Sequence, residues 1–291
     1  RGYKNMKKSF FTNAFLALIM SSFLVLSAGT ANAKRLTAAV ADWTGGEITC
    51  QVAVSILEQE LGYKVERIVF PSGTGLWEAI AAGDIDFACE SWPGYAEADD
   101  VMLSAPLYYD GEVVQEYSGT GEVIAFTTGI IGASDYYVPK YFMDANPDFN
   151  GWEDLNKFKA EFATVETGSK GRLIGCPVAG WNCHDQKRLD IMGIDFEAVE
   201  LGTETALLAE AQGAFDRKEP FLMYLWEPHF FFGKNEMVGV GLPTHQSCDS
   251  YTEANNWKDC GMGSWPASNW PKDYTMNYMN PEVMATPENA E

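Results

Sequence analysis

Three short segments near the start of the chain decide the fold: RLTAAVADW (residues 35–43), KVERIVF (64–70) and DIDFACESW (84–92). Their alternating or β-branched apolar residues are typical of strands. Between them, Glu47–Leu61 carries Ile48, Val52 and Ile56 at helical spacing, and Leu76–Ala82 ends at a glycine. This βαβαβ order predicts a parallel sheet with right-handed crossovers, and therefore an α/β fold.

Two tryptophans stand at the ends of predicted strands. Trp43 ends the first strand and Trp92 ends the third. Ligands of open parallel sheets bind beyond the carboxyl ends of the strands. We therefore expect both side chains to lie at the ligand-binding edge of the sheet.

The first 33 residues have the features of a secretory signal peptide. Lys7 and Lys8 precede a short apolar run over residues 15–26, which leads to the A-x-A site at residues 31–33. We expect cleavage after Ala33, an exported protein in the periplasm, and upstream sequence before Met6. At the other end, Thr286–Glu291 has the composition of a helix start without its body, so we expect the chain to continue.

The charge of the exported part excludes some partners. Residues 1–33 hold four basic side chains and no acid, which leaves sixteen basic and forty-one acidic side chains, a net charge near −25. Nucleic acids and anionic membrane surfaces would be repelled, so neither is an expected partner. A cationic ligand is compatible with this charge, and so is a merely solvated acidic surface.

Six cysteines follow the signal segment, and an even count in an exported protein suggests disulfides. Cys176 and Cys183 flank a Pro- and Gly-containing turn, and Cys248 and Cys260 flank a polar loop, so each pair could close a short loop. Cys50 and Cys89 remain, and their pairing is left open. Zinc bound by Cys176, Cys183 and His184 is an alternative, but the spacing fits no standard finger; we expect neither metal nor cofactor.

The second half of the chain also alternates between strand and helix patterns. Arg172–Cys176 and Pro220–Trp226 are predicted strands, and Thr203–Lys218 is a predicted helix. Four residues share one face of that helix: Ala206, Leu207, Ala211 and Phe215. A second α/β lobe accounts for this span.

The sequence is unusually rich in tryptophan, with nine copies. No G-x-S-x-G, P-loop or G-x-G-x-x-G motif occurs after residue 33, so an enzyme has little support. A quaternary ammonium cannot donate a hydrogen bond, and aromatic faces recognise it at roughly 0.5–2 kcal/mol each. Four tryptophans at strand ends or in the cysteine-bounded turn are candidates: Trp43, Trp92, Trp181 and Trp226.

Several motifs resemble one family when taken together and in order. GCPVAGWNC (175–183) resembles the cysteine-bounded G-W loop of periplasmic glycine betaine/proline betaine-binding proteins of ABC importers. YLWEPHF (224–230) resembles their W-x-P-aromatic segment, and GDIDF (83–87) followed by ESWP (90–93) resembles their G-D-I-D strand with its ligand tryptophan. YVPKY (137–141) is similar to a V-P-x-Y element of the wider betaine- and choline-binding group. The matches cover residues 36 to 285.

The resemblance implies a type II periplasmic-binding-protein fold with a ligand cleft between two α/β lobes. Lobe I would comprise residues 34–127 with 262–291, and lobe II residues 128–261. The implied cage is Trp92, Trp181 and Trp226, with the main-chain N–H groups of Asn182 and Cys183 receiving a ligand carboxylate. Trp43, which follows Asp42, matches the place where choline-type relatives put a cage tryptophan near an acid.

The sequence also departs from the family pattern. The cysteine loop is one residue longer, and no histidine follows Trp92 to help bind a carboxylate. His229 is a candidate for that role; the alternative is a histidine paired at the lobe surface. The cage favours glycine betaine, but choline, carnitine, proline betaine and dimethylsulfoniopropionate suit it too.

The implied partner is an ABC-transporter permease in the inner membrane, whose ATPase drives import of the ligand, with the binding protein a monomer. Two other hypotheses stay open: a secreted enzyme acting on a small cationic substrate, and a receptor lobe that senses a ligand.

Overall fold

The computed structural model describes residues 35–70, 74–92, 104–109, 112–118, 121–181, 183–245, 267–270 and 273–285. The signal segment, Asn182, Cys248, Cys260 and the stretch from Thr286 lie outside these residues. The helices are α2 (Thr44–Gln59), α3 (Thr74–Ala82), α4 (Lys140–Ala145), α5 (Leu155–Phe162), α6 (Asp185–Met192), α7 (Glu204–Asp216) and α8 (Pro281–Ala285), with 3-10 turns at Trp152–Asp154, Ala179–Trp181 and Phe230–Gly233.

The strands form one large sheet and a separate hairpin. They are β1 (Arg35–Val40), β2 (Lys64–Val69), β3 (Phe87–Ser91), β4 (Ser104–Tyr109), β5 (Glu112–Ser118), β6 (Ile124–Pro139), β7 (Gly171–Ile174), β8 (Phe196–Val199), β9 (Leu222–Glu227), β10 (Met237–Gly239) and β11 (Asp273–Met279). The order of the large sheet is β2-β1-β3-β11-β6-β9-β7-β8, with β10 on β6, while β4 pairs with β5. β1 pairs in parallel with both β2 and β3, as the βαβαβ order predicts.

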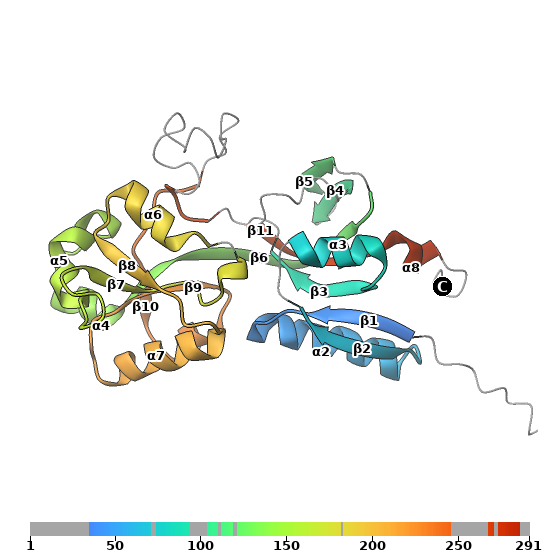
Figure 1. Cartoon of the computed structure of the whole chain (residues 1–291), viewed down its shortest axis with the longest axis horizontal. Coiled ribbons are helices and arrows are strands. Elements are labelled where there is room, and N and C mark those ends of the chain that lie inside the picture. The colour runs from blue at the N-terminus through green and yellow to red at the C-terminus, as the bar shows by residue number, and fades with distance from the viewer. Residues whose placement is uncertain are drawn as a thin grey trace, which may run out of the picture.

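The strand β6 belongs to both halves of the sheet (Figure 1). Its first part, residues 124–132, pairs antiparallel with β11, and residues 133–137 pair antiparallel with β9. We call β1, β2, β3 and β11, with α2 and α3, the first half, and β7 to β10, with α4 to α7, the second half. β6 therefore runs as one continuous strand from the first half of the sheet into the second.

Hydrophobic residues cover both faces of the first half and fill the second. Cys50 and Val54 of α2 pack on one face of β1 and β3, and Trp77 and Ile80 of α3 pack on the other. A larger core surrounds β7, β9 and the end of β6. A disulfide joins Cys50 of α2 to Cys89 of β3, a pairing that the sequence left open.

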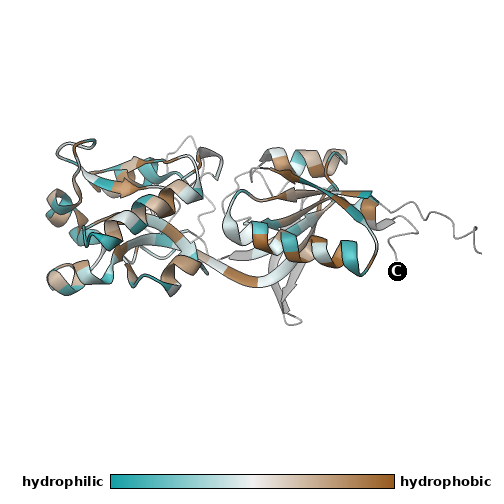
Figure 2. Cartoon of the chain, turned by 90° about the horizontal axis from the view of Figure 1, so that it is seen from below, coloured by the Kyte–Doolittle hydropathy of each residue, from teal (hydrophilic) through white to brown (hydrophobic). Residues whose placement is uncertain are grey.

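Helix α2 exposes the apolar residues that identified it in the sequence. Ile48, Val52 and Ile56 are 60%, 57% and 53% exposed, and Gly46, Cys50 and Val54 are buried instead. The helix shows a mixture of apolar and polar positions from below (Figure 2). Small residues bring α2 close to the sheet, so the bulky aliphatic side chains point elsewhere.

Helix α7 confirms the predicted helix at Thr203–Lys218 with a slightly different buried face. Leu207 and Ala211 are buried as expected, but Ala214 takes the place of Phe215. Glu204 is buried at the start of the helix, which the sequence did not predict. Within the described residues, no helix is both long and apolar enough to cross a membrane.

Candidate ligand-binding site

Neighbouring parallel strands bring Trp43 and Trp92 to the same edge of the sheet. β1 and β3 pair in register at Ala38 and Phe87, so the segments that follow them leave the sheet side by side. Trp43 stands at the N-cap position of α2 with extended backbone and is buried. Trp92 directly follows β3 and is half-buried.

A buried carboxylate connects these two tryptophans. Oε1 of Glu90 accepts hydrogen bonds from Nε1 of Trp43 at 2.8 Å and from Nε1 of Trp92 at 3.2 Å. Its Oε2 accepts from the hydroxyl of Thr49 on α2 at 2.7 Å. The Glu90 residue is 7% exposed. Glu90 and Trp92 are two residues apart, which in a strand places both side chains on one face.

A glycine of β6 makes room for the ring of Trp92. A Cβ atom at Gly132 would lie 2.0 Å from Cζ3 of Trp92, far inside van der Waals contact. The indole ring therefore lies directly on the backbone of the strand that runs through both halves. Any side chain at position 132 would displace it.

The second half contributes Trp181 from the cysteine-bounded loop. A disulfide joins Cys176 and Cys183, and a 3-10 turn over Ala179–Trp181 presents the tryptophan. Nε1 of Trp181 donates to Oδ1 of Asp42 in the first half at 2.9 Å. Asn182, expected to offer its main-chain N–H, is outside the described residues.

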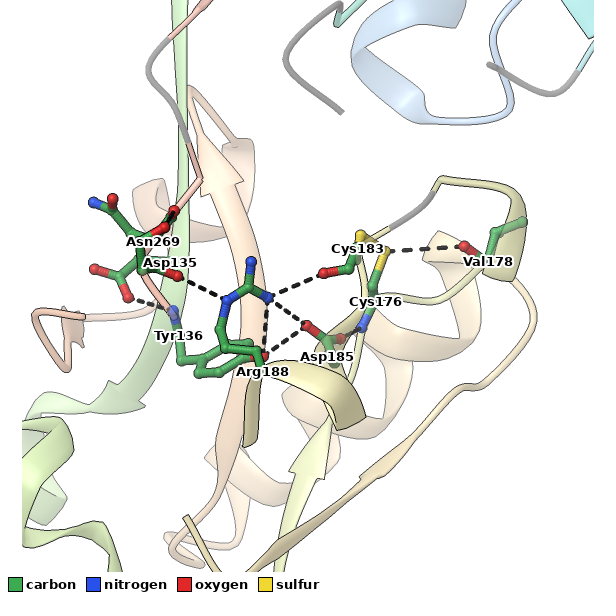
Figure 3. Close-up of polar contacts among 9 residues, drawn as sticks. Asp135, Tyr136, Cys176, Val178, Cys183, Asp185, Arg188 and Asn269 are labelled. Atoms are coloured by element: carbon green, nitrogen blue, oxygen red, sulfur yellow. Dashed lines mark hydrogen bonds and ion pairs between the residues drawn. A yellow bond between two sulfur atoms is a disulfide. The ribbon is translucent and has the colours of Figure 1, made fainter. Parts of the chain in front are cut away.

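An ion pair beneath this loop holds both of its ends (Figure 3). The main-chain N–H of Cys176 donates to Oδ2 of Asp185 at 2.6 Å, and Nη1 of Arg188 donates to the carbonyl of Cys183 at 3.0 Å. Asp185 and Arg188 contact each other, and the Tyr136 hydroxyl donates to Asp185. The guanidinium of Arg188 is fully buried. The loop carrying Trp181 therefore has a rigid base.

Aromatic rings from both halves meet in a continuous row. The Trp181 ring packs edge-to-face on Trp43 with centroids 5.6 Å apart, and on Trp226 at 5.5 Å. Trp226, near the end of β9, contacts the His229 ring at 4.7 Å. These distances are those of favourable aromatic pairs. Three of the four candidate cage tryptophans thus form one cluster, and Trp92 joins it through Glu90.

A second buried carboxylate links α7 to the start of α2. Oε2 of Glu204 accepts from the main-chain N–H of Thr44 at 2.6 Å and from its hydroxyl at 2.8 Å, and Oε1 contacts Nε2 of His229 at 2.9 Å. Desolvation, the largest influence, raises the pKa of Glu204, but the hydrogen bonds from His229 and Thr44 together hold this pKa below its usual value. Glu204 therefore remains a carboxylate that caps the positive end of α2.

His229 has protein partners at both ring nitrogens. Its Nδ1 accepts from the main-chain N–H of Phe231 at 3.1 Å, which leaves Nε2 to carry the proton that Glu204 accepts. The side chain is only 3% exposed. A ligand carboxylate would therefore have to replace Glu204 to bind this histidine.

A groove of about 640 Å³ opens nearby on β6. Ile131 and Ala133 line it together with Pro228, His229 and Phe232. His229, whose ring contacts Trp226, connects this groove to the tryptophan row.

The structure brings together most of the residues that the sequence singled out. Trp43, Trp92, Trp181, Trp226, Asp42 and His229 are all in this region, and Cys183 anchors the loop through its carbonyl. Sequence reasoning missed Glu90, Glu204 and Gly132. The E-x-W spacing at a strand end was the one signal that could have identified Glu90.

Comparison with known proteins assigns a family. Residues 34–283 match the family described as the substrate-binding domain of the ABC-type glycine betaine transport system.

Solved structures have a similar fold. The glycine betaine, L-proline-binding protein ProX of an ABC transporter from Borrelia burgdorferi is 18% identical, with a TM-score of 0.56 over 88% of this chain and 79% of its own. Lactococcal OpuAC, solved closed with glycine betaine, is 14% identical, with a TM-score of 0.54 over 88% and 81%. An ABC-transporter choline-binding protein solved with choline is 16% identical, with a TM-score of 0.54 over 88% and 74%. The expected α/β binding-protein fold is thereby confirmed.

Proposed function

This chain belongs to the family of substrate-binding domains of ABC-type glycine betaine transport systems, and from that premise we propose that it binds a small quaternary ammonium or sulfonium compound. The ligand head lies among the indole rings of Trp43, Trp92, Trp181 and Trp226. The observation that carries the proposal is the row of edge-to-face rings, which is built from both halves of the sheet.

The chemistry of the rings supports this ligand class. A methylated onium group has no N–H to donate, so hydrogen-bond acceptors cannot select it, whereas the faces of indole rings attract it. Each face contributes roughly 0.5–2 kcal/mol, and several faces together reach several kcal/mol when water is excluded. The carboxylates of Asp42, Glu90 and Glu204 add negative charge around the same rings.

Binding requires the two halves to move apart and close again. The ring centroids of Trp43 and Trp181 are 5.6 Å apart, and the two rings are in contact. An onium group can therefore lie between them only after the rings separate. Trp43 and Trp92 belong to the first half, and Trp181 and Trp226 to the second. Rotation about β6 and the connections beside it would open the site, and closure would bury the ligand head.

The proposal extends to the domains, the cell compartment and the partner. Lobe I comprises residues 34–127 with 262–291, and lobe II residues 128–261. After cleavage behind Ala33 the protein works as a monomer in the periplasm and passes its ligand to an inner-membrane permease. The main-chain N–H groups of Asn182 and Cys183 receive the polar end of the ligand. No chemical step takes place.

Titration of tryptophan fluorescence tests the proposal directly. Glycine betaine, choline and dimethylsulfoniopropionate are each added to the purified protein, and at least one saturable response is expected. Failure of all three to bind would overturn the proposal.

Substitution of single rings then tests where the ligand lies. W181A or W226A should weaken binding by roughly twofold to thirtyfold, the loss of one cation–π face. W152A is the matched control, because Trp152 is half-buried against the core of the second half and lies outside the ring row. Equal losses for all three variants would show that the ligand binds elsewhere.

A further inference from the structure

Three indole N–H groups of the site donate to carboxylates. Glu90 accepts from Trp43 and Trp92, and Asp42 accepts from Trp181. Each carboxylate lies at the N–H edge of its ring and contacts the ring through Nε1. The negative charge thus lies at the N–H edges of the cage rings.

No basic side chain among the described residues neutralises these carboxylates. Neither Glu90 nor Asp42 forms an ion pair with a Lys, Arg or His side chain in the part of the chain that the structure describes. The hydrogen-bond donors that Glu90 meets within the described part of the chain are neutral: two indoles and the Thr49 hydroxyl. Because Glu90 is buried, its field at the rings is screened much less than that of a surface acid.

The nearest helix terminus is also unavailable to an anion. The N-terminus of α2, which begins at Thr44 beside Trp43, would ordinarily attract a carboxylate. Glu204 already accepts from the N–H and hydroxyl of Thr44. Apart from the main-chain N–H groups proposed for the polar end of the ligand, the charged groups described around the cage therefore favour positive charge on the ligand.

Resting on the proposed function, we propose that Glu90 and Asp42 are specificity-determining residues, which make the cage prefer onium ligands of net positive charge over zwitterionic ones. Both ligand types present the same methylated head to the indole faces. Only the net cation gains from the two carboxylates without also bringing a negative group toward them. Choline and tetramethylammonium represent the first type, and glycine betaine represents the second.

The variant E90Q separates the charge of Glu90 from its hydrogen bonding. Its amide oxygen can still accept from Trp43 and Trp92, while the negative charge is gone. Affinities of the wild type and E90Q for choline, tetramethylammonium and glycine betaine are measured by calorimetric titration. We expect the ratio of choline to betaine affinity to fall roughly tenfold, which corresponds to about 1.4 kcal/mol, with tetramethylammonium following choline.

A purely structural role for Glu90 predicts a different result. Disordered rings would weaken all three ligands by the same factor, and an unchanged affinity ratio would overturn the proposal. E47Q is the matched control, because it removes one negative charge from an exposed position of α2 and should leave the ratio unchanged.

Two further outcomes are informative. If E90Q does not fold, the same affinities are measured for D42N, because Asp42 is half-buried and its one described hydrogen bond is to Trp181. An unchanged ratio of choline to betaine affinity in D42N then overturns the proposal. If the wild type binds none of the onium compounds, it is the proposed function that fails, whatever the variants do.

Discussion

The tryptophans of the site differ from a core tryptophan in what their N–H groups contact. Trp77 of α3 packs on Tyr278 with ring centroids 4.2 Å apart, and its buried N–H has no hydrogen-bond partner among the described residues. Trp43 and Trp181 instead donate to carboxylates. A ring fixed through its N–H edge keeps its orientation while its faces exchange partners, which suits a binding site.

Asp135 of β6 gives the fold a dependence on pH. Desolvation raises the pKa of this carboxyl from 3.8 to about 6, against hydrogen bonds from backbone N–H groups. The folded protein therefore binds this proton more tightly than the unfolded chain. The contribution of this proton to the free energy of unfolding is fully present below pH 4, decreases as pH rises to about 6, and is absent above pH 6. The total decrease is up to about 3 kcal/mol.

Replacement of Asp135 by asparagine should remove this dependence. We expect D135N to flatten the fall in the free energy of unfolding between pH 4.5 and 7.5, and to raise stability at pH 7.5. Urea unfolding across this pH range measures both. D148N, at an exposed position, should retain the wild-type profile. A wild-type profile in D135N would contradict the argument.

The acids of the site show where prediction from the sequence ends. Four tryptophans could be proposed because they are rare and stand at strand ends or in a bounded turn. Glu90 and Glu204 could not, because a single acid carries little information in a chain with forty-one of them. Their roles arise from contacts between residues 47 and 160 positions apart, which no local pattern encodes.

Among the secondary-structure elements, the strands were easier to predict than the buried faces of the helices. The order of β1, α2, β2, α3 and β3 follows from local alternation and glycine stops. The orientation of α2 does not, because Cys50 is held against the sheet by its disulfide to Cys89 and small neighbours allow close approach. The helical spacing of bulky apolar residues in the sequence therefore identified the exposed face of α2 and not its buried face.

The contact between β6 and Trp92 provides a test at the level of one strand. G132A should push the indole away from Glu90, since the new Cβ would overlap the ring. We expect weaker ligand binding together with a loss of about 1–3 kcal/mol in stability. G233A is the control, because a Cβ there meets nothing within 4 Å. Unchanged ligand affinity in G132A would show that the position of Trp92 does not matter for binding.

The two described disulfides should differ in their contributions to stability. Cys176 and Cys183 are seven positions apart, and Cys50 and Cys89 are thirty-nine apart. Chain-entropy arguments predict losses of about 2.5 kcal/mol for C176A/C183A and about 4 kcal/mol for C50A/C89A. Chemical denaturation of both double variants measures this difference, and the reverse order would contradict it.

The short disulfide should matter less for binding than its position suggests. Asp185 and Arg188 still hold the two ends of the loop when the sulfur bridge is removed. We therefore expect C176A/C183A to keep measurable ligand affinity in the fluorescence titration. Complete loss of binding in a folded C176A/C183A protein would show that the ion pair alone cannot position Trp181.

For the molecule as a whole, few polar contacts between described residues connect the two halves across the site. Asp42 accepts from Trp181, and Glu204 accepts from Thr44, in each case between residues of different halves. β6 and β11 supply the continuous sheet between them. If the protein closes on a ligand as proposed, these carboxylates contribute to closure together with the ring contacts, and each of them should affect how long a ligand stays bound.

Glu204 allows this dependence to be measured. Hydrogen bonds to a charged group contribute about 1.5–3 kcal/mol each, so E204A should release a bound ligand on the order of tenfold faster or more. E204Q keeps one acceptor oxygen for Thr44 and should fall between E204A and the wild type. Stopped-flow dissociation gives the rates, and X-ray scattering should show a larger radius of gyration for ligand-free E204A.

The control variant E210Q changes an acid on the same helix that pairs with Arg172 instead, and it should release ligand at the wild-type rate. Identical rates for E204A and E210Q would mean that the rings alone hold the two halves together.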